Sequence, residues 1–563
     1  MTSRSKSTEN PQDSGLSTQH SALSSQSSAL STQHSALSSQ SSALSTQIPI
    51  AHPATLGELF RRARLALPAD APAQTPLTGF TDDSREVTPG GGFLAAAGEA
   101  VDGHQFIPAA LAKGAAVVIA ERVPEGTDAR KAVLLENTRQ ALPPLAHAWW
   151  GNPSRGMKVI GITGTNGKTT TAYLTEALLR ANGGHPALFS TVEYRFGEVH
   201  RPAPNTTPGA FQFARLLAEF RALGADSVAM EVSSHALVQG RVDAVEFDIA
   251  VITNVTQDHL DYHRTMEEYA EAKRLLFTKH KPKWAIFNLD DATAARFAAE
   301  RRGRKRTYSL DRAAGADLFP LSLEVGADGI RMHVHFPTRE EPRARRLIAS
   351  EVVALESPLR GRFNASNLLA AAAIGVALGF EPGRIVEGLR HMRGAPGRFE
   401  TVDAGQPFAV YVDYAHTPDA VERVLENVRL ITRGRVIVVL GCGGDRDPGK
   451  QPKMGAAMGR LADYSVITND NPRTEDPAKI AAAMEAGILE TKGRGAYEVC
   501  LDRREAIRRA IALAKPGDSV LIAGKGHETY QIVGKEHSHF DDRETAAEIC
   551  RGRLEFGVLS LES

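Results

Sequence analysis

The sequence predicts an α/β protein of three domains that follow a disordered N-terminal tail. A chain of 563 residues exceeds the size of one hydrophobic core, since single cores stop growing at about 250 to 300 residues. After residue 151, short apolar runs typical of buried strands alternate with longer runs typical of helices, which indicates parallel sheets covered by helices. Two turn-rich segments, residues 151–156 and 394–397, separate the domains.

The tail comprises residues 1–47, which are dominated by serine, glutamine, alanine and threonine. Residues 17–30 recur without change as residues 31–44, a tandem repeat of 14 residues. With almost no large apolar side chains, this segment cannot offset an ordering entropy of about 1 to 2 kcal/mol per residue, so we expect it to be disordered. It lacks the apolar core of a signal peptide and the arginine content of a typical transit peptide, which disfavours a targeting role.

Apolar runs bounded by turn residues locate the strands of each domain. The first domain, residues 48–152, is a small α/β domain with an expected helix at 56–67 and strands near 79–84 and 92–96. The second, residues 153–393, has a mostly parallel sheet with strands at 158–162, 227–232, 248–254 and 284–288 and helices at 171–182 and 267–277. The third, residues 394–563, is Rossmann-like, with strands at 408–412, 435–440, 464–468 and 519–523.

The composition excludes several classes of partner. Lysine plus arginine and aspartate plus glutamate both number 66, so no global field favours nucleic acid or an anionic membrane. The three cysteines are widely spaced, which gives neither a disulfide framework nor a zinc knuckle. The longest apolar stretch, about 368–380, is shorter than the about 20 residues that span a bilayer, and a buried helix explains it better. We expect a cytoplasmic monomer that acts on small molecules, without a nucleic-acid or membrane partner.

A phosphate-binding loop follows the first strand of the second domain. Residues 161–170 read GITGTNGKTT between a strand and a helix, the arrangement that cradles nucleotide phosphates. Glycines let backbone N–H groups approach phosphate oxygens, Lys168 supplies a positive charge, and the Thr169 hydroxyl can bind Mg²⁺. The strict spacing would place a glycine at Ile162, whereas here glycines stand at Gly161 and Gly164. The loop therefore predicts a nucleotide with Mg²⁺, bound by a variant of the common motif.

Other polar clusters follow strands of the same domain. A carboxylate beside the loop strand, Glu231, is placed to hold Mg²⁺, although a solvated strand-end carboxylate is an equally common alternative. The next strand ends in residues 254–263, NVTQDHLDYH, which suits a metal or phosphate site, with zinc disfavoured because no third ligand is evident. Taken alone, Lys273 is typical of a surface lysine near Glu271. The turn at 205–208 could bind substrate oxygens or cap the helix that follows it.

Three turns of the third domain also follow predicted strands. They read GCGGDRDPGK at 441–450, DNPR at 470–473 and GKGHE at 524–528. Arginine pairs bidentately with carboxylate and Glu528 can pair with ammonium, so the set suits a zwitterionic substrate. Taken singly, each of the three is more commonly an ordinary turn.

With these motifs the chain resembles the Mur ligase family, ATP-dependent amide-forming enzymes of peptidoglycan synthesis, over nearly all of residues 50–560. The resemblance rests on residues 164–170, 205–207, 231–235, 258–259, 364–367, 397–400 and 413–416. Within the family, the Asp-Ser-Arg at 83–85 and the Asp-Asn-Pro-Arg at 470–473 resemble members that add meso-diaminopimelate to UDP-N-acetylmuramoyl-L-alanyl-D-glutamate. Lysine-adding members usually differ at the second motif.

The resemblance implies three groups of binding residues. ATP, as co-substrate, would be bound by Gly164, Thr165, Asn166, Gly167, Lys168, Thr169, Thr170, Asn367, Arg398 and Asp413. The UDP-muramoyl dipeptide would be bound by the first domain and the loops of the second, through Ser84, Glu99, Ala100, Val101, Asn205, Thr206, Thr207, Ser233, Gln239 and Arg241. Diaminopimelate would be bound by the third domain, through Arg446, Asp470, Asn471, Pro472, Arg473, Gly524 and Glu528.

The resemblance also implies catalytic roles for Lys168, Lys273, His259 and Glu231. Lys273 matches the family position that carries a carbamylated lysine (N6-carboxylysine), whose anionic form can bind Mg²⁺ together with Thr169, Glu231 and His259. The implied reaction runs through an acyl phosphate, which the acceptor amine then attacks.

Three alternatives remain open at this point. A related ligase could add L-lysine instead. A folylpolyglutamate-synthase-like or cyanophycin-synthetase-like ligase would share the loop variant, but residues 83–85 and 470–473 argue against both. A nucleotide-switched binding protein is disfavoured because no Asn-Lys-x-Asp guanine-reading motif is present.

Overall fold

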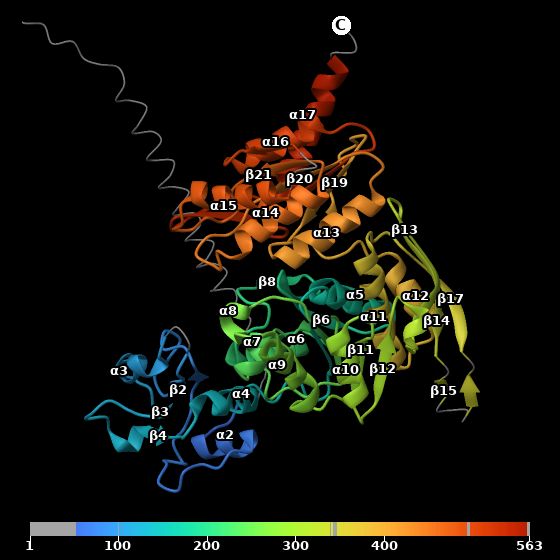
Figure 1. The fold of residues 1–563 in the computed structure, drawn as a ribbon. Helices are drawn as coiled ribbons and strands as arrows, with labels where there is room; N and C mark the ends of the chain where they lie inside the picture. Colours follow the sequence, from blue (N-terminus) through green and yellow to red (C-terminus); the bar gives the residue numbers. More distant parts are fainter. Residues whose placement is uncertain are drawn as a thin grey trace, which may run out of the picture. The chain divides into compact units, whose positions relative to one another are not determined.

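The computed structural model describes residues 52–98, 101–337, 339–341, 346–348, 350–491 and 496–559. Contacts divide the chain into Met1–His52 and Pro53–Ser563, and the second unit carries all the sheets (Figure 1). The predicted tail, residues 1–47, lies outside the described residues. Three large sheets, each with helices, confirm the α/β class, whereas the predicted boundaries at 152/153 and 393/394 stay predictions.

The N-terminal sheet has four parallel strands in the order β1-β2-β3-β4. They are β1 (Phe80–Thr81), β2 (Gly92–Leu94), β3 (Val117–Ala120) and β4 (Ala132–Leu134), accompanied by α2 (Leu56–Ala63), α3 (Ile107–Ala112) and α4 (Thr138–Trp149). The first helix ends before the predicted residue 67 because Arg64 adopts a left-handed conformation, with φ 58°, and caps it. Apolar residues of α2 and α4 cover one face of this sheet.

The central sheet has eight strands in the order β12-β11-β10-β5-β9-β6-β7-β8. The first six in this order are parallel, and β7 and β8 form an antiparallel edge. The strands are β5 (Lys158–Thr163), β6 (Pro186–Phe189), β7 (Glu193–Phe196), β8 (Val199–Pro202), β9 (Ser227–Glu231), β10 (Ile249–Ile252), β11 (Trp284–Asn288) and β12 (Lys305–Tyr308). The loop strand β5 is therefore central, and all its residues after Lys158 are buried.

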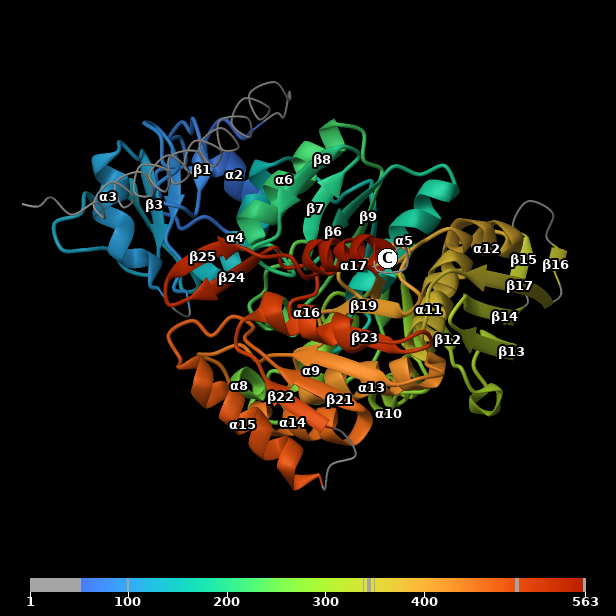
Figure 2. The same cartoon turned by 90° about the horizontal axis from the view of Figure 1, so that it is seen from above.

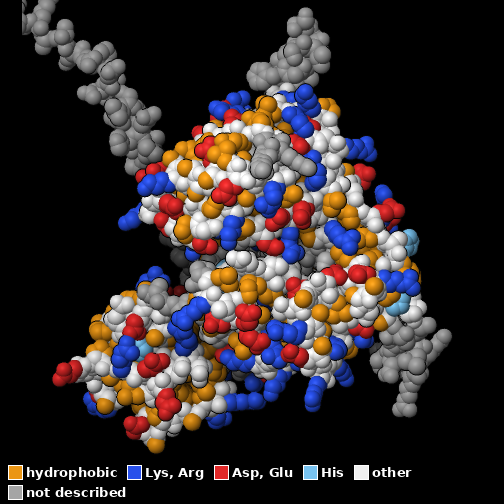
Figure 3. Space-filling view, viewed as in Figure 1, with side chains coloured by type: hydrophobic (Ala, Val, Ile, Leu, Met, Phe, Trp, Pro, Cys, Tyr) orange, Lys and Arg blue, Asp and Glu red, His pale blue; other side chains and the backbone are white. Residues whose placement is uncertain are grey.

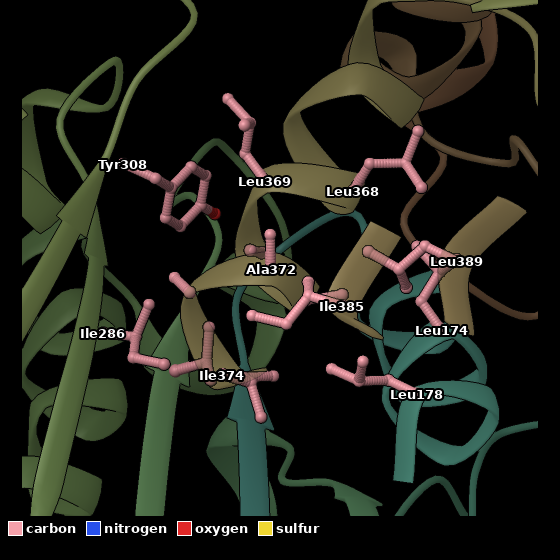
Figure 4. Packing of buried hydrophobic residues seen from close by; sticks show 14 of the residues in the cluster. Leu174, Leu178, Ile286, Tyr308, Leu368, Leu369, Ala372, Ile374, Ile385 and Leu389 are labelled. Carbon is pink, nitrogen blue, oxygen red and sulfur yellow. The ribbon is translucent and has the colours of Figure 1, made fainter. Parts of the chain in front are cut away.

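Helices cover both faces of the central sheet and enclose two separate cores. One face carries α5 (Lys168–Ala181), α11 (Arg362–Leu378) and α12 (Pro382–Arg390), whose side chains meet in Figure 4, where Leu178, Ile374 and Ile385 point toward one another. The other face carries α6 (Ala210–Ala222), α9 (Met266–Thr278) and α10 (Ala292–Glu300). The apolar stretch near 368–380 belongs to α11, which confirms the predicted buried helix.

A region that the sequence did not predict lies between β12 and α11. It forms an antiparallel sheet of β13 (Phe319–Gly326), β14 (Gly329–Phe336) and β17 (Glu351–Ser357), with a hairpin of β15 (Arg339–Glu341) and β16 (Arg346–Ile348). Figure 2 shows β13, β14 and β17 side by side next to α12.

The C-terminal sheet has the order β18-β19-β23-β20-β21-β22, with only β18 antiparallel to its neighbour. Its strands are β18 (Glu400–Thr401), β19 (Ala409–Asp413), β20 (Val436–Leu440), β21 (Tyr464–Ile467), β22 (Ala496–Val499) and β23 (Ser519–Ala523). One face packs on α13 (Pro418–Ile431), α14 (Lys450–Leu461) and α15 (Pro477–Glu490), and the other on α16 (Arg503–Leu513) and α17 (Asp542–Leu559). A hairpin, β24 (Tyr530–Val533) with β25 (Glu536–His539), follows β23.

Two surface properties bear on partners. Among the described helices, none is long and apolar enough to cross a membrane. On the face shown in Figure 3, basic and acidic side chains are interspersed, in agreement with the balanced charge of the chain.

Candidate active site

The phosphate loop joins β5 to α5, and two of its glycines are required by the backbone. Gly164 has φ 147° and Gly167, which precedes α5, has φ 83°. A Cβ on Gly164 would lie 1.9 Å from Thr253 Oγ1, and one on Gly167 would lie 2.4 Å from Asn367 Oδ1. The loop therefore lies directly against the end of β10 on one side and α11 on the other, where no larger residue fits.

Hydrogen bonds hold the loop open for an anion. Thr165 N donates to Asn254 O (2.9 Å), and Asn166 N donates to Asn254 Oδ1 (2.9 Å). The first α-helical bond after the loop runs from Thr171 N to Gly167 O (2.9 Å), so the N–H groups of residues 168–170 have no acceptor within the helix. These three N–H groups and the positive end of the helix dipole are available to an anion such as a phosphate.

Two lysines meet at one carbonyl of the loop. Lys168 Nζ donates to Gly164 O (3.0 Å) and Thr165 O (2.9 Å), and Lys273 Nζ donates to the same Gly164 O (2.9 Å). Lys273 is 1 % exposed, and its amine lies 4.3 Å from the centroid of the Tyr269 ring. The expectation of a surface lysine is thus wrong, because α9 turns this side chain toward β5. Burial, reinforced by the nearby charge of Lys168, lowers the pKa of Lys273 well below its ordinary value, which favours a neutral amine.

Glu231 ends β9 beside the loop strand, where it is paired in register with Ile162. The carboxylate is fully buried and accepts hydrogen bonds from Thr191 N (2.7 Å) and Thr191 Oγ1 (3.1 Å). The solvated strand-end alternative is therefore wrong. Within the described residues no arginine or lysine forms an ion pair with Glu231, and a buried carboxylate without a cation partner suits a bound cation.

His259 follows β10 and has left-handed backbone angles (φ 53°, ψ 31°). Its ring centroid lies 4.9 Å from that of His235 and 6.2 Å from that of Tyr269, which places it near Lys273. Burial lowers the pKa of His259 to about 4 against the opposing charge of Asp258. The ring is therefore neutral at pH 7, the form in which imidazole binds metal.

These groups fit Mg²⁺ better than a closed protein-only site. The described residues contain no cluster of three His, Cys, Asp or Glu side chains that could hold a metal. Mg²⁺ commonly takes one or two protein oxygens and completes its shell with water and phosphate oxygens. Glu231 and the buried Thr169 hydroxyl supply oxygens of this kind.

The turn at 205–207 lies against the same strand end. Thr207 Oγ1 donates to Glu231 O (2.9 Å) and accepts from Ser233 N (3.0 Å), and Arg241 Nη1 donates to Thr207 O (3.0 Å). Gln239 Oε1 accepts from Arg241 Nε (2.7 Å). The helix-cap alternative is wrong, because α6 begins after Gly209 without a side-chain cap. The structure thus brings together the predicted residues of the second domain, including Asn205 and Thr206 within the turn.

The other predicted residues belong to the other two sheets. Ser84 and Val101 lie after β1 and β2, while Glu99 and Ala100 fall outside the described residues. Asp413 ends β19 and accepts from Phe399 N (2.7 Å), and the Arg398 guanidinium stacks 4.5 Å from the Tyr414 ring centroid.

In the C-terminal sheet, two acceptor turns touch each other. We define them as the first acceptor turn, residues 470–473 after β21, and the second acceptor turn, residues 524–528 after β23. Asn471 Nδ2 donates to Glu528 Oε2 (2.8 Å), and a Cβ on Gly524 would lie 2.4 Å from Asp470 Oδ2. Arg473 Nη1 donates to Gly444 O (2.8 Å), which joins the third turn to them, and Arg446 of that turn is exposed.

Three buried residues, one within the second acceptor turn and two beneath both turns, were not predicted. Lys525 is fully buried between Asn471 and Glu528, and Arg503 forms a fully buried ion pair with Asp542 (2.7 Å). Lys525 could have been inferred from its place in the predicted turn. The sequence does not mark Arg503 and Asp542 as buried, because each lies among other charged residues at the start of a helix.

Comparisons with known proteins identify the family of the chain. Models of the Mur ligase family match at residues 76–150 (catalytic domain), 162–375 (middle domain) and 397–526 (glutamate ligase domain). The chain is 42 % identical to the UDP-N-acetylmuramoyl-L-alanyl-D-glutamate--2,6-diaminopimelate ligase of Solibacter usitatus over 501 residues, which covers 88 % of this chain and 98 % of the relative. It is 44 % identical to the protein of the same name from Geobacillus thermodenitrificans over 478 residues, with 84 % and 94 % covered.

A solved structure of an enzyme with that name is 34 % identical to this chain, with a TM-score of 0.63. The match covers 89 % of this chain and 99 % of the chain in that structure. A folylpolyglutamate synthase of Mycobacterium tuberculosis shares the fold alone, at 18 % identity and a TM-score of 0.54 over 75 % of this chain and 95 % of its own. With such identity over almost the whole length of its relatives, the chain belongs to the Mur ligase family of ATP-dependent amide ligases.

Proposed function

We propose that this chain joins meso-diaminopimelate to the D-glutamate of UDP-N-acetylmuramoyl-L-alanyl-D-glutamate at the expense of ATP, as a step of peptidoglycan precursor synthesis in the cytoplasm. The observation that carries the proposal is the contact of the two acceptor turns through Asn471 and Glu528 (2.8 Å). In this proposal Glu528 supplies a carboxylate for an ammonium group, and Arg473, on the same turn as Asn471, supplies a guanidinium for a carboxylate. Relatives at 42–44 % identity bear the corresponding name.

ATP phosphates are held by the loop between β5 and α5 in this proposal. The N–H groups of residues 168–170 face the phosphates, and Lys168 moves its amine from Gly164 O and Thr165 O to the phosphate oxygens. Thr169, Glu231 and His259, with Lys273, would hold Mg²⁺. When bound, Mg²⁺ supplies positive charge that offsets the negative charge of the transferred phosphoryl group.

Lys273 joins this set as a carbamate. Its neutral amine forms an N–C bond with CO₂ and releases a proton, so a neutral group becomes an anion. The buried position of the amine, next to Lys168 at the shared Gly164 carbonyl, supports this step because two adjacent ammonium groups would repel each other. The carbamate would pair with Lys168 and present oxygens to the metal.

The reaction needs two anions to meet, since a substrate carboxylate attacks the γ-phosphate. Lys168 offsets their repulsion and the carboxylate becomes an acyl phosphate, with ADP released. Glu528 and Arg473 hold diaminopimelate so that its neutral amine attacks the acyl carbon. A tetrahedral intermediate forms, phosphate leaves with the proton that the attacking nitrogen gives up, and the amide remains. Arg398 and Asp413 would contact ATP from the third sheet, and Ser84 with residues 99–101 would contact the uridine end.

A phosphate-release assay tests the proposal. The purified chain with ATP, Mg²⁺ and the UDP-muramoyl dipeptide is expected to release phosphate only when meso-diaminopimelate is added, and chelation of Mg²⁺ should stop it. Equal release with L-lysine would contradict the acceptor assignment. Release with a folyl substrate and glutamate, or tight nucleotide binding without turnover on any acceptor, would overturn the proposal.

A further inference from the structure

Lys525 is a buried cation inside the acceptor site. It is the second residue of the second acceptor turn, and its side chain is 0 % exposed. Its amine donates to Asn471 Oδ1 (3.1 Å) and Glu528 Oε2 (3.3 Å) and lies 5.5 Å from the Tyr530 ring centroid. Burying a charged lysine away from water costs free energy unless the charge is paired and hydrogen-bonded. Among the described residues, its hydrogen bonds and its ion pair go to Asn471 and Glu528 of the acceptor turns.

Lys525, Asn471 and Glu528 form a closed triangle of hydrogen bonds. Besides its two bonds to Lys525 and Glu528, Asn471 accepts from Ile532 N at Oδ1 (2.9 Å). An ammonium group can only donate, so it compels the amide to present Oδ1 to Lys525 and Nδ2 to Glu528. Both donors converge on Glu528 Oε2. In the part of the chain that the structure describes, no hydrogen bond engages Glu528 Oε1.

We propose that Lys525 is a positioning residue for the acceptor: it holds Glu528 by Oε2 and thereby aims Oε1 at an ammonium group of the incoming diamino acid. The inference rests on the proposed function, because it presumes that Glu528 binds the acceptor. Lys525 itself need not touch the substrate. Its effect passes through the orientation and charge of Glu528.

The charges around Glu528 show why a cation is needed there. Asp470, 6 % exposed, lies on the first acceptor turn, and burial together with Asp470 raises the pKa of Glu528, while Lys525 and Asn471 oppose the rise. Glu528 in turn raises the pKa values of three neighbouring groups, Arg503, Tyr414 and Tyr530. Asp542 already neutralises Arg503. Removal of Lys525 would therefore leave Glu528 next to Asp470 with a still higher pKa.

The test replaces Lys525 and follows each substrate separately. For Lys525→Met we expect the KM for diaminopimelate to rise by at least about tenfold, as for the loss of a charged hydrogen bond, while the KM for ATP stays within about twofold. Ionised Glu528 binds the ammonium group, and this binding is lost as the pH falls through its pKa. Because the variant raises that pKa, the acid limb of kcat/KM for diaminopimelate should move to higher pH. Lys525→Arg, which keeps the charge, should restore most of the affinity.

Two further variants separate positioning from folding. Lys525→Gln fills the site without a charge and carries the same prediction if Lys525→Met fails to fold by circular dichroism. Lys283→Met is the matched control, since Lys283 pairs with Asp248 (2.6 Å) at the exposed start of β11, and it should leave both KM values and the acid limb unchanged. The double variant Lys525→Met/Glu528→Gln should lose no more than Glu528→Gln alone.

The inference is overturned if Lys525→Met or Lys525→Gln leaves the KM for diaminopimelate and the acid limb in place, or if the losses add in the double variant. The parent protein keeps this outcome distinct from a failure of the proposed function. If the unsubstituted protein releases no phosphate with diaminopimelate, the proposed function is contradicted. If it is active but the Lys525 variants keep the same KM for diaminopimelate and the same acid limb, only the positioning role is contradicted.

Discussion

The buried ion pair beneath the acceptor turns provides a sharp test of the energetics of the C-terminal sheet. Arg503 donates to both carboxylate oxygens of Asp542 (2.8 and 2.7 Å), and both side chains are 0 % exposed. The same guanidinium donates to Asn469 O (3.0 Å) and Ala523 O (2.9 Å). These carbonyls immediately precede the first and second acceptor turns. One cation thus holds the starts of both turns, and Asp542 is its ion-pair partner.

Asp542→Asn keeps the shape of the side chain and removes its charge. Breaking a buried pair from one side leaves an uncompensated charge and costs about 3 to 5 kcal/mol. At about 1.4 kcal/mol per tenfold, amides that exchange only when this sheet opens should exchange about 140 to 3,700 times faster. Suitable amides are those of Thr468, which donates to Leu440 O (3.0 Å), and Gly524, which donates to Asp413 O (3.1 Å).

Hydrogen exchange followed by mass spectrometry on peptides covering 464–470 and 519–524 is the assay. Tryptophan fluorescence would not report on this sheet, because the three tryptophans are Trp149, Trp150 and Trp284. The control is Arg429→Met, which removes a half-exposed pair between α13 and Asp463 (2.6 Å), the residue before β21, and should change exchange by less than about fivefold. Exchange in Asp542→Asn within that same range would refute the reasoning.

Three other substitutions probe the remaining parts of the site. Lys273→Ala should nearly abolish turnover, with partial rescue by added short carboxylic acids in the phosphate-release assay, and unaffected activity would contradict the carbamate role. Arg473→Ala should raise the KM for diaminopimelate far more than that for ATP, because it removes a charged contact of about 2 to 5 kcal/mol; equal effects on all substrates would indicate a purely structural turn. Gly164→Ala, where a Cβ would lie 1.9 Å from Thr253 Oγ1, should lower kcat/KM for ATP by at least about tenfold, whereas Gly183→Ala, with φ 82° and open space, should retain it.

Much of the fold could be predicted because parallel strands buried on both faces are continuous apolar runs. Residues 158–162 and 519–523 are such runs, and they became β5 and β23. The antiparallel sheet of β13, β14 and β17 escaped because its strands expose one face and alternate with polar residues, as in residues 329–336, where buried and exposed positions alternate. That pattern is weaker in sequence than an unbroken apolar run.

The candidate site likewise contains residues that the sequence predicts and residues whose position depends on tertiary packing. Motif residues such as Gly167 and Asn471 were predictable because each follows a strand and the strand ends of a parallel sheet meet at one edge. Taken in isolation, Lys273 is typical of a surface lysine, because the sequence of its helix does not show which face turns inward toward Gly164. Its burial follows from the packing of α9 against β5.

By itself, the sequence determined the class of fold, the position of the phosphate loop and the polar turns that end the strands, because these depend on local patterns of apolar, glycine and charged residues. Only the tertiary structure decided which charges are buried together. Lys168 meets Lys273 across 105 residues at one carbonyl, and Arg503 meets Asp542 across 39 residues beneath two turns. The energy of a charge depends on the water and partners around it, and those are supplied by packing between distant segments rather than by neighbours along the chain.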